Sequence, residues 1–167
     1  MNYLLPLIAV ILGYILALVI QPKKKSNLKL LLAFSGSFLL SVTVISLLPE
    51  VYETKNTTIG LYIMLGILFQ IILEFFSKGA EHGHVHGHQT ITHIPWLLFI
   101  SLCIHALLEG FPVGHHHDLS IGIAIHHLPI AIILTTFFVQ AQLNKKAIFA
   151  FMITFAMMTP LGTLASN

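Results

Sequence analysis

The 167-residue sequence has very little charge: it contains no arginine, eight lysines and six acidic residues, and only 8% of its residues are charged. Soluble domains carry about 25% charged residues, so this composition excludes an ordinary water-facing surface. The single cysteine, Cys103, excludes an intrachain disulfide and a metal site built from cysteines alone. A formal net charge of +2 implies no nucleic-acid partner. With 56% hydrophobic residues, the chain is predicted to be an integral membrane protein.

Histidine is the exception to this shortage of polar side chains. Eleven histidines nearly match the fourteen lysine and acidic residues together. Imidazole is the commonest protein ligand for transition metals and also carries protons near neutral pH. The composition therefore indicates metal or proton chemistry inside a lipid-facing protein.

Apolar segments of about bilayer length dominate the chain. They lie at residues 3–21, 28–48, 59–76, 94–113, 119–140 and 147–164. We expect one all-α transmembrane domain over residues 1–167, a bundle of six spans with a histidine-rich cytoplasmic loop at 77–93. Lysines follow the first segment and none precede it, which reverses the order of a cleavable signal peptide, so this segment is expected to be retained.

Lysine is distributed very unevenly between the two ends of the predicted spans. Only Lys55 falls on one side, and the other side holds the remaining seven: Lys23, Lys24, Lys25, Lys29, Lys78, Lys145 and Lys146. Because cytoplasmic ends collect positive charge, the N-terminus is predicted to lie outside and the histidine-rich loop inside. Short loops and lysine in place of arginine favour a bacterial inner membrane.

Segments four and five carry the histidines that lie within the membrane. His105 and Glu109 are four residues apart and share one face of a helix. His126 and His127 are about 100° apart on the next helix, so one can face that pair while the other flanks it. Imidazole and carboxylate ligands suit zinc, iron(II), manganese or cobalt. The alternatives are a packed histidine beside a glutamate that reaches the interface, and a hydrogen-bonded core pair.

Three other features bear on this site. Pro112 and Pro129 lie inside apolar runs and are expected to bend or locally unwind them. At Pro129 this frees the carbonyl of Ile125, next to His126, which favours a polar site in segment five. Cys103 points away from His105 on its helix and is interpreted as a packing residue.

Two further histidine clusters lie outside the spans as auxiliary candidates for metal binding. The predicted cytoplasmic loop contains His82, His84, His86, His88 and His93, the first four spaced two apart. This spacing predicts weak binding of divalent cations, with a flexible linker as the alternative. The outer turn contains His115, His116 and His117, followed by Asp118. This turn is either an entry point for metal or, as we prefer, a polar cap favoured by the helix dipole.

The order of these motifs resembles the ZIP (Zrt/Irt-like) family of divalent-metal transporters, over its first six of eight spans. The resemblance rests on Ser46–Glu50 in segment two, His105–Gly110, His126–Pro129, Thr159–Gly162 and the position of the histidine-rich loop. It implies an ion carrier, not an enzyme, that moves Zn²⁺, or another divalent ion such as Fe²⁺, Mn²⁺ or Cd²⁺, toward the cytoplasm. It also implies alternating access, with segments one, four, five and six moving together.

Departures from the family pattern narrow the expected site. Ala106 and Ile130 stand where many members carry an asparagine and a second glutamate. The resemblance therefore implies a single metal site formed by His105, Glu109 and His126, with the role of His127 left open. Because the family has eight spans, we expect the chain to be a fragment.

Other functions remain as alternatives at this stage. A metal-binding or metal-sensing homologue without transport fits the same residues. A haem carrier would use His105 and His126 as axial ligands. A membrane di-iron oxygenase would need HxxHH clusters, which the chain lacks. The expected partners are divalent ions and the lipid bilayer, and a homodimer is compatible with the sequence.

Overall fold

A computed structural model describes residues 4–20, 25–54, 56–77, 95–114 and 117–166 of the chain. The elements in order are α1 (Leu4–Ile20), α2 (Lys25–Val42), the π-helix η1 (Thr43–Leu47), α3 (Leu48–Glu53), α4 (Ile59–Ser77), α5 (Trp96–Gly110), the 3-10 helix η3 (Phe111–Gly114), α6 (His117–Gln140) and α7 (Lys145–Ala165). All regular structure in the described residues is helical, which confirms the all-α prediction.

Most of these helices are long and apolar enough to cross a membrane. Within the described residues, five stretches qualify by length and composition: Lys29–Glu53, Ile59–Phe76, Trp96–Gly114, Asp118–Gln140 and Lys145–Ala165. The first helix, α1, is apolar but shorter, with 17 residues. The chain is therefore a helical membrane bundle, as its composition predicts.

The second span extends further than its apolar run predicts. The helix continues from α2 through η1 to the end of α3 at Glu53, whereas the prediction ended at residue 48. Pro49 has no N–H to donate to the carbonyl four residues earlier and would normally interrupt an α-helix. The π-helical turn directly before it widens the helix at this point, so the chain passes the proline without stopping.

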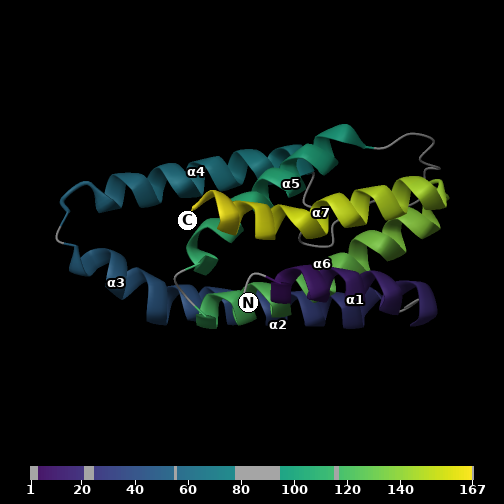
Figure 1. Ribbon diagram of the computed structural model, residues 1–167, viewed down its shortest axis with the longest axis horizontal. Helices are drawn as coiled ribbons and strands as arrows, with labels where there is room; N and C mark the ends of the chain where they lie inside the picture. The colour runs from purple at the N-terminus through teal and green to yellow at the C-terminus, as the bar shows by residue number, and fades with distance from the viewer. Residues whose placement is uncertain (1–3, 21–24, 55, 78–94, 115–116, 167) are drawn as a thin grey trace.

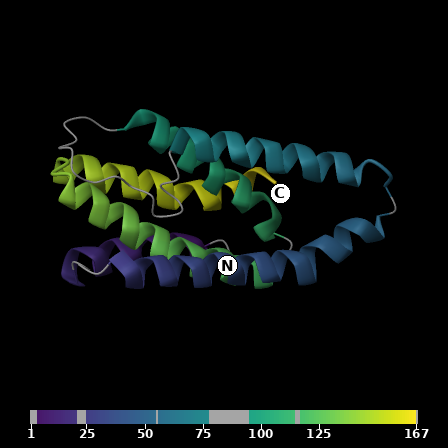
Figure 2. The ribbon, with the colours of Figure 1, turned by 180° about the vertical axis from the view of Figure 1, so that it is seen from behind.

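Two groups of helices can be distinguished in the bundle. In the central group, α1 packs on both α6 and α7, and α5 packs on α7. The peripheral helices have fewer neighbours, since α2 packs on α6 and α4 packs on α5. Figures 1 and 2 show α3 and the first turns of α4 projecting beyond the central helices at one end.

An aromatic and aliphatic core joins the central helices. Phe138 of α6 packs in a T-shaped contact with Phe151 of α7, with ring centroids 4.7 Å apart, and both side chains are fully buried. Glycine permits the closest approach between α5 and α7, because a Cβ on Gly162 would collide with the carbonyl oxygen of Leu107. A Cβ on Gly110 would likewise collide with the carbonyl oxygen of Thr159.

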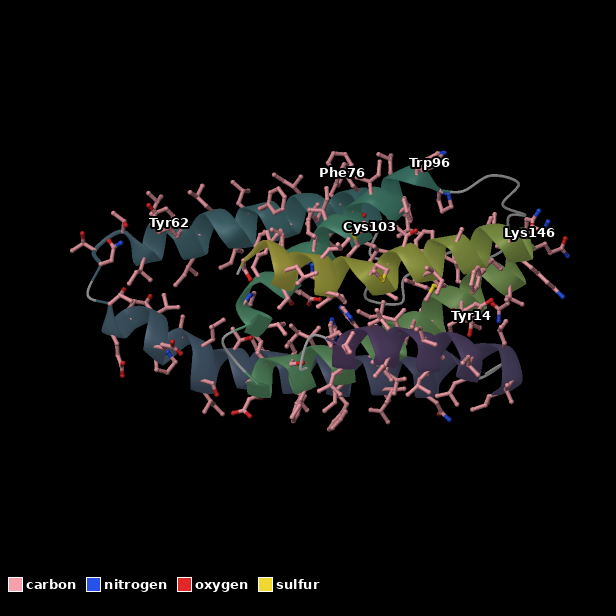
Figure 3. The ribbon with its side chains drawn as sticks, viewed as in Figure 1. Tyr14, Tyr62, Phe76, Trp96, Cys103 and Lys146 are labelled. Carbon is pink, nitrogen blue, oxygen red and sulfur yellow. The ribbon has the colours of Figure 1, made fainter. Side chains whose placement is uncertain are left out.

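The ends of the bundle differ in polarity. Figure 3 shows Lys146 and Trp96 near one end and Tyr62 at the opposite end. The start of α2 and the turn between α6 and α7 share the Lys146 end (Figure 1), so the fold brings Lys29, Lys145 and Lys146 to the same end. Helices that cross the membrane in alternating directions would bring these three lysines to the same end. Which side of the membrane this end faces stays a prediction.

Candidate metal centre

Helix α5 contributes an imidazole and a carboxylate to one point inside the bundle. Nε2 of His105 lies 3.3 Å from Oε1 of Glu109, one helical turn further on. The two side chains are 15% and 14% exposed. Both are therefore directed into the protein. A glutamate extending to the interface, the alternative that the sequence leaves open, does not describe Glu109.

Helix α6 contributes the two adjacent histidines, which take different positions. One ligand atom each from His105, Glu109 and His126 lies within 4.8 Å of the others. His127 approaches from another direction, and its Nε2 lies 2.7 Å from Oε2 of Glu109. The carboxylate is thus held between imidazoles from both helices. The structure brings together all four histidine and glutamate residues that the sequence singles out within the membrane.

The spacing of this cluster suits a small divalent cation. Two ligands of a tetrahedral zinc ion, each about 2.1 Å from the metal, lie about 3.4 Å apart. The separation between His105 and Glu109 already matches this value. The 4.8 Å limit for the whole set is wider than this value. Two imidazoles and one carboxylate also form a common zinc donor set.

Two polar residues that sequence reasoning missed lie directly behind the candidate ligands. Oε1 of Gln70 on α4 lies 3.0 Å from Nδ1 of His105. Oγ of Ser35 on α2 lies 3.4 Å from Nδ1 of His126. A lone amide in the apolar run 59–76 is a signal that could have identified Gln70. Ser35 carries no such signal, because α2 also contains Ser37 and Ser41.

The two positions where the sequence departs from the ZIP pattern lie in the apolar core. Ala106 and Ile130 are 0% and 2% exposed and belong to the same apolar cluster as Leu102 and Phe155. Neither side chain offers a ligand atom. At these positions the chain fills space with hydrocarbon, which favours the single-site interpretation.

The prolines behave differently from one another. At Pro112 the α-helix gives way to the 3-10 helix Phe111–Gly114, as the expected local break requires. At Pro129 the expected unwinding is not observed, because α6 is α-helical from His117 to Gln140. The proline still leaves the carbonyl of Ile125 without an N–H from residue 129.

Several candidate residues fall outside the cluster. Cys103 is a free, partly buried cysteine and does not belong to the His105 group. Helix α6 begins at His117, with Asp118 in its first turn, where the helix dipole favours an acidic residue. Seven histidines lie outside the described residues: His82, His84, His86, His88, His93, His115 and His116.

Fold and site together define the class of this protein, a helical membrane protein with a partly buried histidine–glutamate cluster that could hold a divalent metal. Comparison with known proteins points the same way. Zinc transporter ZIP1 of Danio rerio is 25% identical over 110 residues, which covers 52% of this chain and 36% of that protein. The chain thus matches about a third of the length of this relative. No protein-family model matches the chain, and no solved structure matches it.

Proposed function

We propose that this protein is a ZIP-like carrier that moves a divalent metal ion, zinc foremost, across the membrane toward the cytoplasm. The observation that carries the proposal is the convergence of ligand atoms from His105, Glu109 and His126 within 4.8 Å, between α5 and α6. Placing ionisable groups inside a transmembrane bundle is costly, and such groups mark ion pathways by default. The similarity to a zinc transporter supports the same function.

The donor set predicts how the ion is held. One carboxylate neutralises half the charge of a dication, so a bound water or hydroxide completes both the coordination and the charge balance. His126 and the pair on α5 supply three ligands, which leaves a position open for that water. An open position suits a carrier, because ligand exchange at a partly hydrated ion is needed for release.

The packing of the bundle suits movement of the central helices. The ligands lie on α5 and α6, and α1 and α7 pack around these helices. These four helices correspond to the segments that the family resemblance expects to move together. We propose that they shift against α2 and α4, exposing the ion first to one side of the membrane and then to the other.

The direct test is zinc uptake into proteoliposomes containing the 167-residue chain. Glu109→Ala removes the only carboxylate of the cluster and is expected to abolish uptake. Glu53→Ala is the matched control, because Glu53 is exposed at the end of α3 and lies outside the cluster. Unchanged uptake by Glu109→Ala would refute the assignment of this site.

A binding measurement separates transport from metal binding alone. Zinc at about 100 times its Kd should stabilise the folded protein by about 2.7 kcal/mol, measured as a rise in Tm that Glu109→Ala removes. Stabilisation by zinc without any uptake would identify a metal-binding or sensing protein instead of a carrier.

A further inference from the structure

Each of the two peripheral helices contacts one of the candidate ligand histidines through a polar side chain, and in both contacts the ring atom is Nδ1. Gln70 of α4 reaches Nδ1 of His105, and Ser35 of α2 reaches Nδ1 of His126. The direction of each hydrogen bond determines which ring nitrogen carries the proton, because a neutral imidazole has one donor and one acceptor.

For His105 the direction follows from the chemistry of its partner. The amide oxygen of Gln70 can only accept a hydrogen bond. When Nε2 of His105 binds a metal ion, the neutral ring carries its one proton on Nδ1, which then donates to this oxygen across the 3.0 Å contact. Without an ion, Nε2 of His105 faces the carboxylate of Glu109 at 3.3 Å and donates to it, so an ion that binds at Nε2 takes the place of that proton.

For His126 the direction follows from a third residue. The hydroxyl of Ser35 has one proton, and it donates that proton to the backbone carbonyl of Leu32 at 2.9 Å. Toward His126 the same oxygen can only accept. When Nε2 of His126 binds an ion, the one proton of the neutral ring lies on Nδ1 and is donated to this oxygen, and the 3.4 Å separation makes this hydrogen bond the weaker one.

His127 has the opposite arrangement. Its Nε2 lies 2.7 Å from Oε2 of Glu109, a distance at which the ring donates and the carboxylate accepts. Its Nδ1 is buried and has no hydrogen-bond partner among the described residues. The ring is 1% exposed and packs on Phe155 of α7. His127 is thus placed to hold the carboxylate, while its neighbour His126 is placed to bind the ion.

We propose that Gln70 and Ser35 are positioning residues that accept from Nδ1 of His105 and His126 in the ion-bound site, so that both rings bind the ion through Nε2. The inference rests on the proposed metal site and deepens it, since it adds two residues from helices that carry no ligand. Partners behind a ligand histidine orient the ring and raise its basicity, and their loss costs about 10- to 100-fold in metal affinity.

The test uses ¹⁵N-histidine-labelled, zinc-loaded protein, in which imidazole ¹⁵N shifts report the protonated and the metal-bound nitrogen. Wild-type His105 and His126, assigned by their loss in His105→Asn and His126→Asn, should show protonated Nδ1. Gln70→Leu should change the tautomer signal of His105 alone, and Ser35→Ala that of His126 alone. Ser37→Ala is the matched control, because Ser37 is exposed on the same helix and donates to the carbonyl of Ala33.

Zinc titration provides the second readout. We expect Gln70→Leu to weaken binding by about 10- to 100-fold and Ser35→Ala by about fivefold. Gln70→Glu keeps an acceptor oxygen and should retain both the wild-type tautomer and the affinity to within about fivefold. If Gln70→Leu does not fold, Gln70→Glu still tests the proposal. A change of the His105 tautomer in Gln70→Glu would contradict it.

The ¹⁵N spectra and the zinc titration together distinguish a failure of the positioning role from a failure of the proposed function. If the wild-type chain binds no zinc, the proposed function fails, and the positioning role that rests on it fails with it. If zinc binds but the folded Gln70→Leu and Ser35→Ala variants keep both spectra and affinity, the site stands and the positioning role is wrong.

Discussion

Helices α6 and α4 are both long apolar spans, yet they differ greatly in what surrounds them. In α6, 61% of the best membrane-spanning window is buried inside the protein, compared with 11% in α4. The central helix packs on α1, α2 and α7, whereas α4 packs on α5. Hydrophobicity alone does not distinguish them, because in lipid an apolar side chain gains little by moving from the bilayer to a protein neighbour.

The difference teaches that close packing, more than hydrophobicity, defines the centre of this bundle. The central helices approach one another through small residues: a Cβ on Gly13 of α1 would lie 2.6 Å from the carbonyl oxygen of Leu128 on α6. The glycines of α4, Gly60 and Gly66, have nothing within 4 Å of a Cβ position. Glycine is therefore required for close helix packing in the central helices, whereas the glycines of α4 have no such packing role.

The largest contrast is expected from these glycines. Gly162→Ala places a methyl group against the backbone of α5, where nothing can move aside cheaply, and should abolish the folded protein. Gly66→Ala adds the same methyl group in open space and should change the free energy of unfolding by less than about 1 kcal/mol. Size-exclusion profiles and Tm in detergent measure both. Equal tolerance of the two substitutions would show that the α5–α7 crossing is not tightly packed.

A smaller contrast is expected from two phenylalanines. Phe138 of α6 is 0% exposed and Phe75 of α4 is 77% exposed. Phe138→Ala leaves a cavity in the core and should cost about 3 kcal/mol. At position 75 the side chain faces outward in both the wild type and Phe75→Ala, so no cavity forms inside the protein. The free energy of unfolding of this variant should stay near the wild-type value. Comparable losses in a reversible unfolding experiment would mean that α4 is buried against something else.

The smallest contrast concerns hydrogen bonds between helices. Thr163 of α7 donates to the carbonyl of Gly110 on α5 at 2.8 Å, while the partly exposed Thr154 donates to the carbonyl of Ala150 in its own helix. Thr163→Val should destabilise the protein by about 1 kcal/mol, since hydrogen bonds between membrane helices are modest in energy. Thr154→Val should have almost no effect on Tm. A larger loss of stability in Thr154→Val than in Thr163→Val would contradict this prediction.

The fold was largely predictable because it depends on local properties of the chain. Each described span coincides with an apolar run of bilayer length, and lipid forces such a run to satisfy its backbone by forming a helix. The end of the second span was wrong by several residues. The apolar run ends near residue 48, whereas the helix continues through the π-helical turn before Pro49 to Glu53.

Half of the candidate site was predictable for the same reason. His105 and Glu109 are four residues apart, so helical geometry alone places them together. The sequence also places one of the two adjacent histidines toward this pair. It contains nothing that assigns Nε2 of His127 to Glu109, or that brings Gln70 and Ser35 behind the ligands, because these contacts join residues far apart in the chain.

By itself the sequence determined that this chain forms apolar helices, that three histidines lie within them, and that a histidine and a glutamate share one helix face. These properties depend on composition and on the 3.6-residue period, which are local. Only the tertiary structure decided which helices are central, that Nε2 of His105 and Nε2 of His127 face Glu109, and which peripheral residues contact the rings. Those outcomes depend on how closely helices can approach and on contacts between residues far apart in the chain, and no local pattern encodes either.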